Sequence, residues 1–186
     1  MQSDWHLSLN GALSQQTGDE VEDNRAASAR LDLRSGWPGQ HWRERLDYWQ
    51  VGPFASWRRF DDNQFDFTRG SGGYFSPQDE YRVGLSSELL SAEGRRWQVR
   101  IGVEVAWTDI TEDATAVAPR QQNRGVNVDG RLQGHWLITP HLQLGARVQA
   151  TDARGFRGSY AGLTLRWFPQ ARRAVWSREL QLDHRD

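Results

Sequence analysis

Hydrophobic and polar residues alternate along most of the chain with the period of two that marks a β-strand with one apolar face. The clearest stretch, residues 95–109, places Val99, Ile101, Val103 and Val105 on one side. Similar alternation predicts strands at residues 5–17, 25–37, 44–60, 81–90, 125–137, 142–148 and 159–168. We therefore predict an all-β fold of about eight antiparallel strands, with no convincing helix before residue 170.

The segments between these stretches differ in length and contain turn residues. Residues 61–78 and 109–123 are long connections, whereas 91–94 and 139–140 are short ones. Outer-membrane β-barrels alternate long extracellular loops with short periplasmic turns in this way. Gly52 and Pro53 lie inside a predicted strand, and we expect a break or bulge there because proline cannot donate to a β-ladder.

Aromatic residues bracket the apolar face of the clearest strand. Trp97 and Trp107 lie ten residues apart, which at ~3.3 Å per residue and a tilt of about 40° is ~25 Å, the height of a lipid-facing band. The last predicted strand ends on Trp167 and Phe168, as the final strands of outer-membrane proteins end on an aromatic residue, although this chain continues further. We expect an antiparallel transmembrane β-barrel, or the C-terminal half of one, rather than a soluble sandwich with the same alternation.

Composition narrows the functional classes. A length of 186 residues suffices for one domain, and a net charge of −1 argues against a nucleic-acid partner. The absence of cysteine excludes disulfides and thiolate metal sites. The five histidines show no metal-ligand spacing, and no catalytic constellation stands out. We therefore predict no metal, no cofactor and no enzymatic activity.

A glycine-rich stretch differs from an ordinary hairpin loop. Residues 68–78 read Thr-Arg-Gly-Ser-Gly-Gly-Tyr-Phe-Ser-Pro-Gln, after an aromatic lead-in at residues 58–67 that contains Asn63. The glycines permit positive φ angles, and Pro77 biases Ser76 toward an extended conformation. Adjacent aromatic residues and a rigid Ser-Pro pair indicate an ordered loop that folds back onto the protein.

The run from Gly72 to Gln78 resembles the signature of the cellulose synthase operon protein C family, which supplies the outer-membrane subunit of bacterial cellulose secretion. A looser resemblance extends from about Leu46 to Phe168. It implies a truncated form of that family's C-terminal barrel, with residues 1–169 as the barrel segment and 170–186 as a charged tail. Family members have a signal peptide, tetratricopeptide repeats and a barrel of about sixteen strands. Residues 1–5 do not resemble a signal peptide, so we expect a C-terminal piece of a longer protein.

The resemblance implies a passive channel in the bacterial outer membrane that exports cellulose or a related polysaccharide. Its partners would be the polymer, outer-membrane lipid and an inner-membrane synthase complex, reached through periplasmic repeats that this chain lacks. The motif assigns a glucan-contacting loop at the channel mouth. It comprises Asn63, Gly70, Gly72, Gly73, Tyr74, Phe75, Ser76, Pro77 and Gln78.

The polar faces of the predicted strands supply candidate residues for the channel wall. These are Arg82, Glu88, Arg100, Glu104, Asp129, Arg131, Arg147 and Arg166. Both charge signs are interspersed, so such a wall offers hydrogen-bond partners without a strong field for ions, which suits a neutral polysaccharide.

Two other functions fit the same residues. One is a soluble carbohydrate-binding β-domain, in which the polar faces meet solvent. The other is a self-contained eight-stranded membrane barrel that acts as an anchor or adhesin, with an interior filled by its own side chains. Tyr74 and Phe75 likewise either pack the loop into the barrel mouth or stack on glucan.

Overall fold

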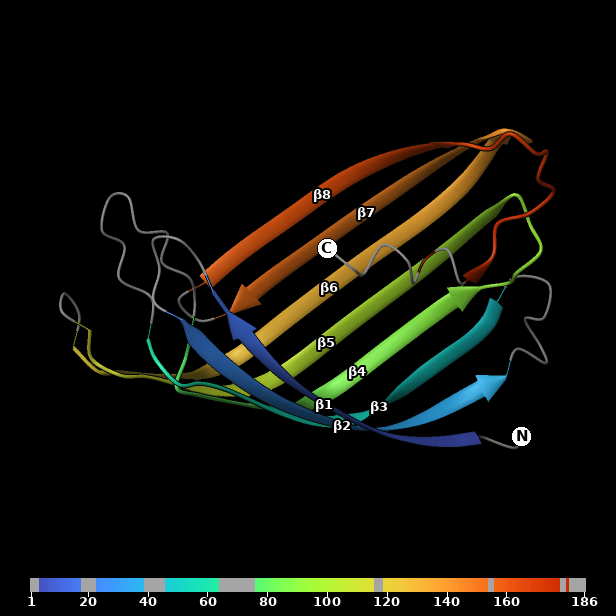
Figure 1. Cartoon of the computed structure of the whole chain (residues 1–186). Coiled ribbons are helices and arrows are strands. Elements are labelled where there is room, and N and C mark those ends of the chain that lie inside the picture. Colours follow the sequence, from blue (N-terminus) through green and yellow to red (C-terminus); the bar gives the residue numbers. More distant parts are fainter. Residues whose placement is uncertain are drawn as a thin grey trace.

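The computed structural model of the chain describes residues 4–17, 23–38, 46–63, 76–115, 119–153, 156–177 and 180. These residues form one antiparallel sheet of eight strands, arranged in chain order (Figure 1). The strands are β1 (Asp4–Gln16), β2 (Asn24–Pro38), β3 (Leu46–Phe60), β4 (Asp79–Ser91), β5 (Trp97–Glu112), β6 (Gln121–Thr139), β7 (Leu142–Ala153) and β8 (Phe156–Trp167). The prediction of an all-β fold with about eight antiparallel strands is confirmed.

The sheet curls into a trough with β1 and β8 as its two edges (Figure 1). Within the described residues β1 pairs only with β2, and β8 only with β7, so the sheet is not closed. An open, curled sheet of up-and-down strands fits one half of a β-barrel. No helix in the part of the chain that the structure describes is long and apolar enough to cross a membrane.

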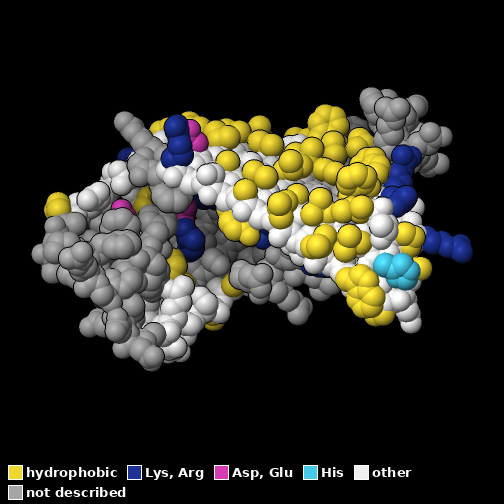
Figure 2. All heavy atoms as spheres, turned by 90° about the horizontal axis from the view of Figure 1, so that it is seen from above, with side chains coloured by type: hydrophobic (Ala, Val, Ile, Leu, Met, Phe, Trp, Pro, Cys, Tyr) yellow, Lys and Arg dark blue, Asp and Glu magenta, His cyan; other side chains and the backbone are white. Residues whose placement is uncertain are grey.

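The convex face of the trough is apolar and exposed. On β5, the side chains of Ile101, Val103 and Val105 are 41%, 43% and 45% exposed. Hydrophobic side chains gather over this outer face in Figure 2. The described strands all belong to one sheet, so the row on β5 is not buried against a second sheet, as it would be in a sandwich.

Aromatic residues mark both ends of this apolar face. We call the end with the β2–β3, β4–β5 and β6–β7 connections the short-turn end, and the opposite end the long-loop end. Exposed tryptophans near the short-turn end are Trp5, Trp49, Trp97, Trp136 and Trp167. Near the long-loop end, Tyr81 and Trp107 are exposed. Because Trp97 pairs with Trp136 across β5 and β6, these rings lie at one level.

The break or bulge predicted at Gly52 and Pro53 is confined to one of the two ladders of β3. Strand β3 continues through both residues and keeps its register with β4. Only the pairing with β2 is interrupted, opposite Leu33 and Arg34, because Pro53 has no N–H to donate. A Cβ atom on Gly52 would collide with the backbone oxygen of Leu33, so this glycine permits the close approach of β2 and β3.

The predicted long connection at residues 109–123 is also shorter than expected. Strand β5 extends to Glu112 and β6 begins at Gln121, and these two residues pair. The alternating apolar pattern ends before the strands do, because here the ladder continues through polar residues such as Thr111 and Gln122.

The segment after β8 is packed against the sheet. Residues 168–177, which we call the terminal strap, pass along the short-turn end (red in Figure 1). The amides of Phe168, Arg172 and Val175 donate to the carbonyl oxygens of His141, Pro140 and Arg95 over 2.9, 2.8 and 2.8 Å. Val175 and Leu180 are fully buried and Ala174 is 7% exposed. The mixed charge of the tail did not indicate this packing.

Candidate channel-lining site

The concave face of the trough gathers the charged side chains. Because successive residues of a strand point to opposite faces, the charged positions in the middle of β2, β4, β5 and β6 point inward together. Glu104 of β5 pairs with Asp129 of β6 on one side and with Ser86 of β4 on the other. The register therefore brings acids and bases from neighbouring strands together.

One cluster of ion pairs centres on Glu104. Its carboxylate accepts hydrogen bonds from Arg30 over 3.2 and 2.9 Å, and it lies 3.7 Å from the guanidinium of Arg82. Arg30 also donates to both oxygens of Asp32 over 2.9 Å. Arg82 bonds Asp129 in turn, which accepts the Thr151 hydroxyl over 2.7 Å. Strands β2, β4, β5, β6 and β7 are thus joined through side chains.

A second cluster centres on Glu88 of β4, which is 5% exposed. Its carboxylate accepts the Tyr48 hydroxyl and, over 2.8 Å, the Arg100 guanidinium. Arg131 lies 3.5 Å from Glu88 and 4.0 Å from Glu104, so it connects the two clusters. Buried carboxylates are tolerated here because each has at least one arginine partner.

Arg30 reaches Glu104 across the two strands that separate them. Phe54 of β3 lies beneath this bridge, buried to 3% exposure, and its ring centroid is 4.1 Å from the Arg30 guanidinium. Phe54 stands opposite Gly84 of β4, which has no side chain to obstruct the bridge. Cation–π contact of this kind contributes about 0.5–2 kcal/mol. Sequence reasoning missed Phe54, although it occupies an inward position on its strand.

The charges within the two clusters nearly balance. Among the described side chains, the two clusters contain the arginines 30, 34, 82, 100 and 131 and the acids Asp32, Glu88, Glu104 and Asp129. The residues that the structure describes contain no group of three or more His, Asp or Glu side chains suited to a metal ion. The two clusters can offer hydrogen-bond donors and acceptors to a ligand but present little net field.

Six of the predicted wall residues belong to these clusters: Arg82, Glu88, Arg100, Glu104, Asp129 and Arg131. The other two lie further along the sheet. Arg147 of β7 stacks 5.9 Å from the ring of Tyr160, and Arg166 of β8 pairs in register with Gln143.

The predicted loop site is described only in part. Gly70, Gly72, Gly73, Tyr74 and Phe75 lie outside the described residues. Ser76 and Pro77 are fully buried at the long-loop end, where the Pro77 carbonyl accepts the Phe60 amide over 3.0 Å.

Gln78 and Asn63 connect this loop to the β5–β6 connection. The Gln78 side chain accepts the Asp113 amide over 2.6 Å and donates to the Ser76 carbonyl over 3.0 Å. The Asn63 amide donates to the Asp113 carbonyl over 2.7 Å. The described end of the signature motif is therefore held firmly at the rim of the trough.

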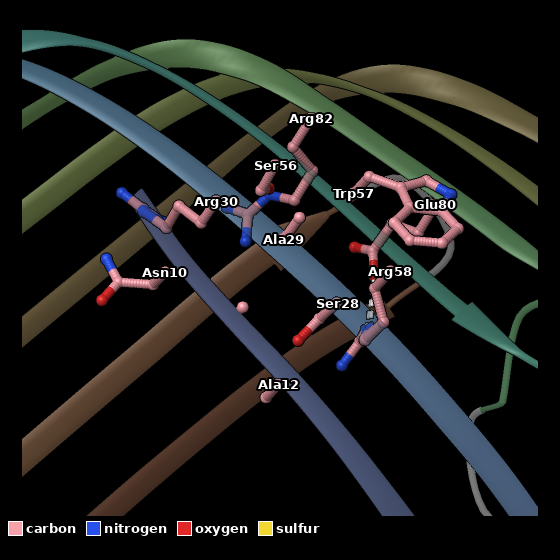
Figure 3. Close-up of a pocket in the computed structure, with 11 residues that line it drawn as sticks. Asn10, Ala12, Ser28, Ala29, Arg30, Ser56, Trp57, Arg58, Glu80 and Arg82 are labelled. Carbon is pink, nitrogen blue, oxygen red and sulfur yellow. Dashed lines mark hydrogen bonds and ion pairs between the residues drawn. The ribbon is translucent and has the colours of Figure 1, made fainter. Parts of the chain in front are cut away.

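Two hollows open on the concave face beside β1. One of about 310 Å³ is lined by Asn10, Ser28, Ser56 and Arg82, with Arg30 at its border (Figure 3). The other, of about 510 Å³, is lined by Ser8, Gln50 and Arg34, again with Arg30. Uncharged hydroxyl and amide groups here lie beside paired charges, a surface suited to a polyhydroxylated ligand.

Comparison with known proteins agrees with the signature motif. Residues 1–170 match the family described as the cellulose synthase operon protein C C-terminus. The chain belongs to this family. It is also 28% identical over 168 residues to the cellulose synthase operon protein C of Pseudomonas fluorescens (strain SBW25). That alignment covers 81% of this chain and 12% of the relative, so the chain spans a small part of the relative's length.

Family membership confirms the resemblance seen in the sequence, and it is consistent with a role in cellulose biosynthesis. The exposed apolar convex face and the charged concave face described above are therefore properties of a member of this family.

Proposed function

We propose that this chain forms part of an outer-membrane channel through which a nascent cellulose chain or related polysaccharide leaves the cell. The observation that carries the proposal is the distribution of side chains, which is the reverse of that in a water-soluble protein. Apolar residues such as Val103 and Val126 are exposed on the convex face, while Glu88 and Asp32 are buried on the concave face. A sheet with this distribution suits lipid outside and a wet lumen inside.

The aromatic residues at the two ends of the convex face support the same proposal. Trp and Tyr side chains form girdles at both interfaces of outer-membrane barrels. The soluble carbohydrate-binding alternative would leave a large apolar surface in water, where surfaces of this kind associate or aggregate.

The concave face supports a neutral polymer as the cargo. The arginines of its two clusters are paired with carboxylates, so along these clusters a hydroxylated chain would meet exchangeable hydrogen bonds and little net charge. In this proposal the polymer arrives from an inner-membrane synthase complex, and lipid covers the outside.

The open edges favour a segment of a larger barrel over a self-contained one. Strands β1 and β8 leave backbone groups unpaired within the described part of the chain, which hydrocarbon does not tolerate. The edge side chains Leu9 and Leu163 are 76% and 79% exposed. We propose that further strands pair with both edges, since eight strands alone would leave no room for a glucan.

The proposal is tested by narrowing the lumen. Ser56→Trp places an indole in the hollow of about 310 Å³, whereas Ala55→Trp places it on the exposed convex face of the same strand. In cells whose cellulose secretion depends on the protein, Ser56→Trp should lower secreted polymer per outer-membrane copy by more than about half, because passage depends on pore diameter. Ala55→Trp should secrete normally. Equal secretion from the two variants would show that no polymer passes this face.

A further inference from the structure

A cluster of polar side chains is buried on the concave face at the short-turn end. Gln98 of β5 is 0% exposed, Gln143 of β7 is 1% exposed and His135 of β6 is 3% exposed. Gln98 and His135 are paired in register, and the Gln143 Nε2 lies 2.8 Å from the His135 Nδ1. Strands β5, β6 and β7 thus bring three hydrogen-bonding side chains to one place.

Part of this hydrogen-bonding capacity is unused. In the described structure, neither the Nε2 nor the Oε1 of Gln98 has a partner, and the Oε1 of Gln143 has none. Buried polar groups are nearly always paired because an unpaired one loses its bonds to water without replacement. An apolar side chain at position 98 would avoid the free-energy cost of burying unpaired polar groups. The unpaired amides of Gln98 and Gln143 therefore point to a ligand that forms hydrogen bonds with them in another state of the protein.

The terminal strap lies at the same end of the sheet. The Val175 amide donates to the Arg95 carbonyl, and the Leu137 amide donates to the adjacent Arg96 carbonyl over 2.7 Å. Val175 on the strap and Leu137 on the concave face are both fully buried. The β4–β5 turn, which contains Arg95 and Arg96, therefore holds the strap next to the inward-facing residues at the end of β6. The strap is joined to this end by individual hydrogen bonds and has no β-ladder to the sheet.

We propose that Gln98, His135 and Gln143 form an entrance subsite for a neutral polysaccharide, which the terminal strap covers in this structure and uncovers when the glycan enters. The side-chain amides offer uncharged hydrogen-bond donors and acceptors, and sugar hydroxyls can pair with both because each hydroxyl donates and accepts. Arg166, in register with Gln143 on β8, borders the subsite. This inference rests on the proposed function, and it identifies where on the wall the polymer is first bound.

The test uses the absence of cysteine from the chain. In Ala174→Cys the new thiol lies on the buried side of the strap, and in Arg173→Cys it lies at an exposed position one residue earlier. Maleimide labelling is measured in outer membranes that hold the assembled protein, with and without cellohexaose. The sugar should raise the labelling rate of Ala174→Cys by about tenfold, the change expected if one buried amide gains a partner. Arg173→Cys should label rapidly in both conditions.

Gln98→Leu in the Ala174→Cys background removes both unpaired amide atoms and should abolish the sugar-dependent increase. As a measurement without substitution at the strap, hydrogen exchange of residues 168–177 in the unaltered protein should quicken when cellohexaose is added. The proposed subsite would be refuted if cellohexaose changed neither the labelling rate nor the hydrogen exchange. It would also be refuted if the sugar-dependent increase in labelling persisted in Gln98→Leu. If secretion still depends on the protein in that case, the proposed channel stands and only the subsite fails. If secretion does not depend on the protein, the channel itself fails.

Discussion

Replacing Val103 by arginine distinguishes a lipid-facing convex surface from one that faces water. Val103 is 43% exposed on the outward row of β5. It lies six residues from Trp97 and four from Trp107, or ~15 Å and ~10 Å along the membrane normal for a strand rise of ~3.3 Å and a tilt of about 40°. Val103 is therefore near the middle of the band that the two tryptophans bracket.

The expected magnitude follows from this depth. An arginine on the lipid face of a barrel costs roughly 2–4 kcal/mol at the bilayer midplane and about 0–1 kcal/mol near the interface. Val103→Arg should therefore shift the folding equilibrium by a factor of roughly 30 to 1,000. Val126→Arg is the matched control, because Val126 is 58% exposed on the same face and pairs with Trp107 at the interface level.

The assay is denaturant unfolding of the assembled protein in lipid vesicles, comparing the free energy of unfolding of each variant with the parent. The difference between Val103→Arg and Val126→Arg should be at least about 1 kcal/mol. A surface substitution in water usually changes stability by less than about 0.5 kcal/mol. If both variants fall within that range of the parent, the convex face does not contact hydrocarbon and the membrane reasoning is wrong.

Three further predictions concern the wall, the strand packing and the loop. Glu104→Gln should destabilise the protein by about 1–3 kcal/mol in denaturant titrations, because it leaves the partly buried Arg30 without one of its two carboxylate partners. An unchanged midpoint of denaturant unfolding would show that this ion pair does not stabilise the fold. Gly84→Ala should lower the free energy of unfolding by about 1–3 kcal/mol because the new Cβ would collide with the β5 backbone, whereas Gly130→Ala, which has open space around it, should leave it unchanged. Equal effects of the two substitutions would refute the close approach of β4 and β5 at Gly84. Replacing Gly72 and Gly73 by valine should reduce secreted polymer while outer-membrane copy number is kept, and parental secretion would show that the motif is not part of the path.

The amphipathic period was sufficient to predict the strands and their two faces. A period of two assigns every second residue of 95–109 to one face wherever the strand lies, so the exposed row from Ile101 to Val105 followed from the sequence alone. The Gly-Gly-Tyr-Phe-Ser-Pro-Gln motif was likewise sufficient to suggest the family that the comparison then established. Assignment of its residues to a glucan-contacting loop stays a prediction.

Strand ends were harder to predict because pairing outlasts the apolar pattern. At Thr111 and Gln122 the ladder continues through polar residues, since at the rim neither face needs to be apolar. At Pro53 the expected interruption affects one ladder and leaves the strand continuous. A missing N–H removes a rung toward one neighbour only, and β3 keeps its partner on the other side.

Only the tertiary structure decided which side chains meet inside the trough. Arg30 and Glu104 are separated by 74 positions and by two strands, so their contact depends on the register of three ladders and on the curvature of the sheet. The terminal strap shows the same limit: Val175 lies in a mixed-charge segment with no periodic pattern, and its burial arises from turns that the fold brings together at one end. Alternation along one strand predicts the face to which a side chain points. The residues that this side chain contacts depend on the curvature of the sheet and on the segments that pack against the ends of the strands.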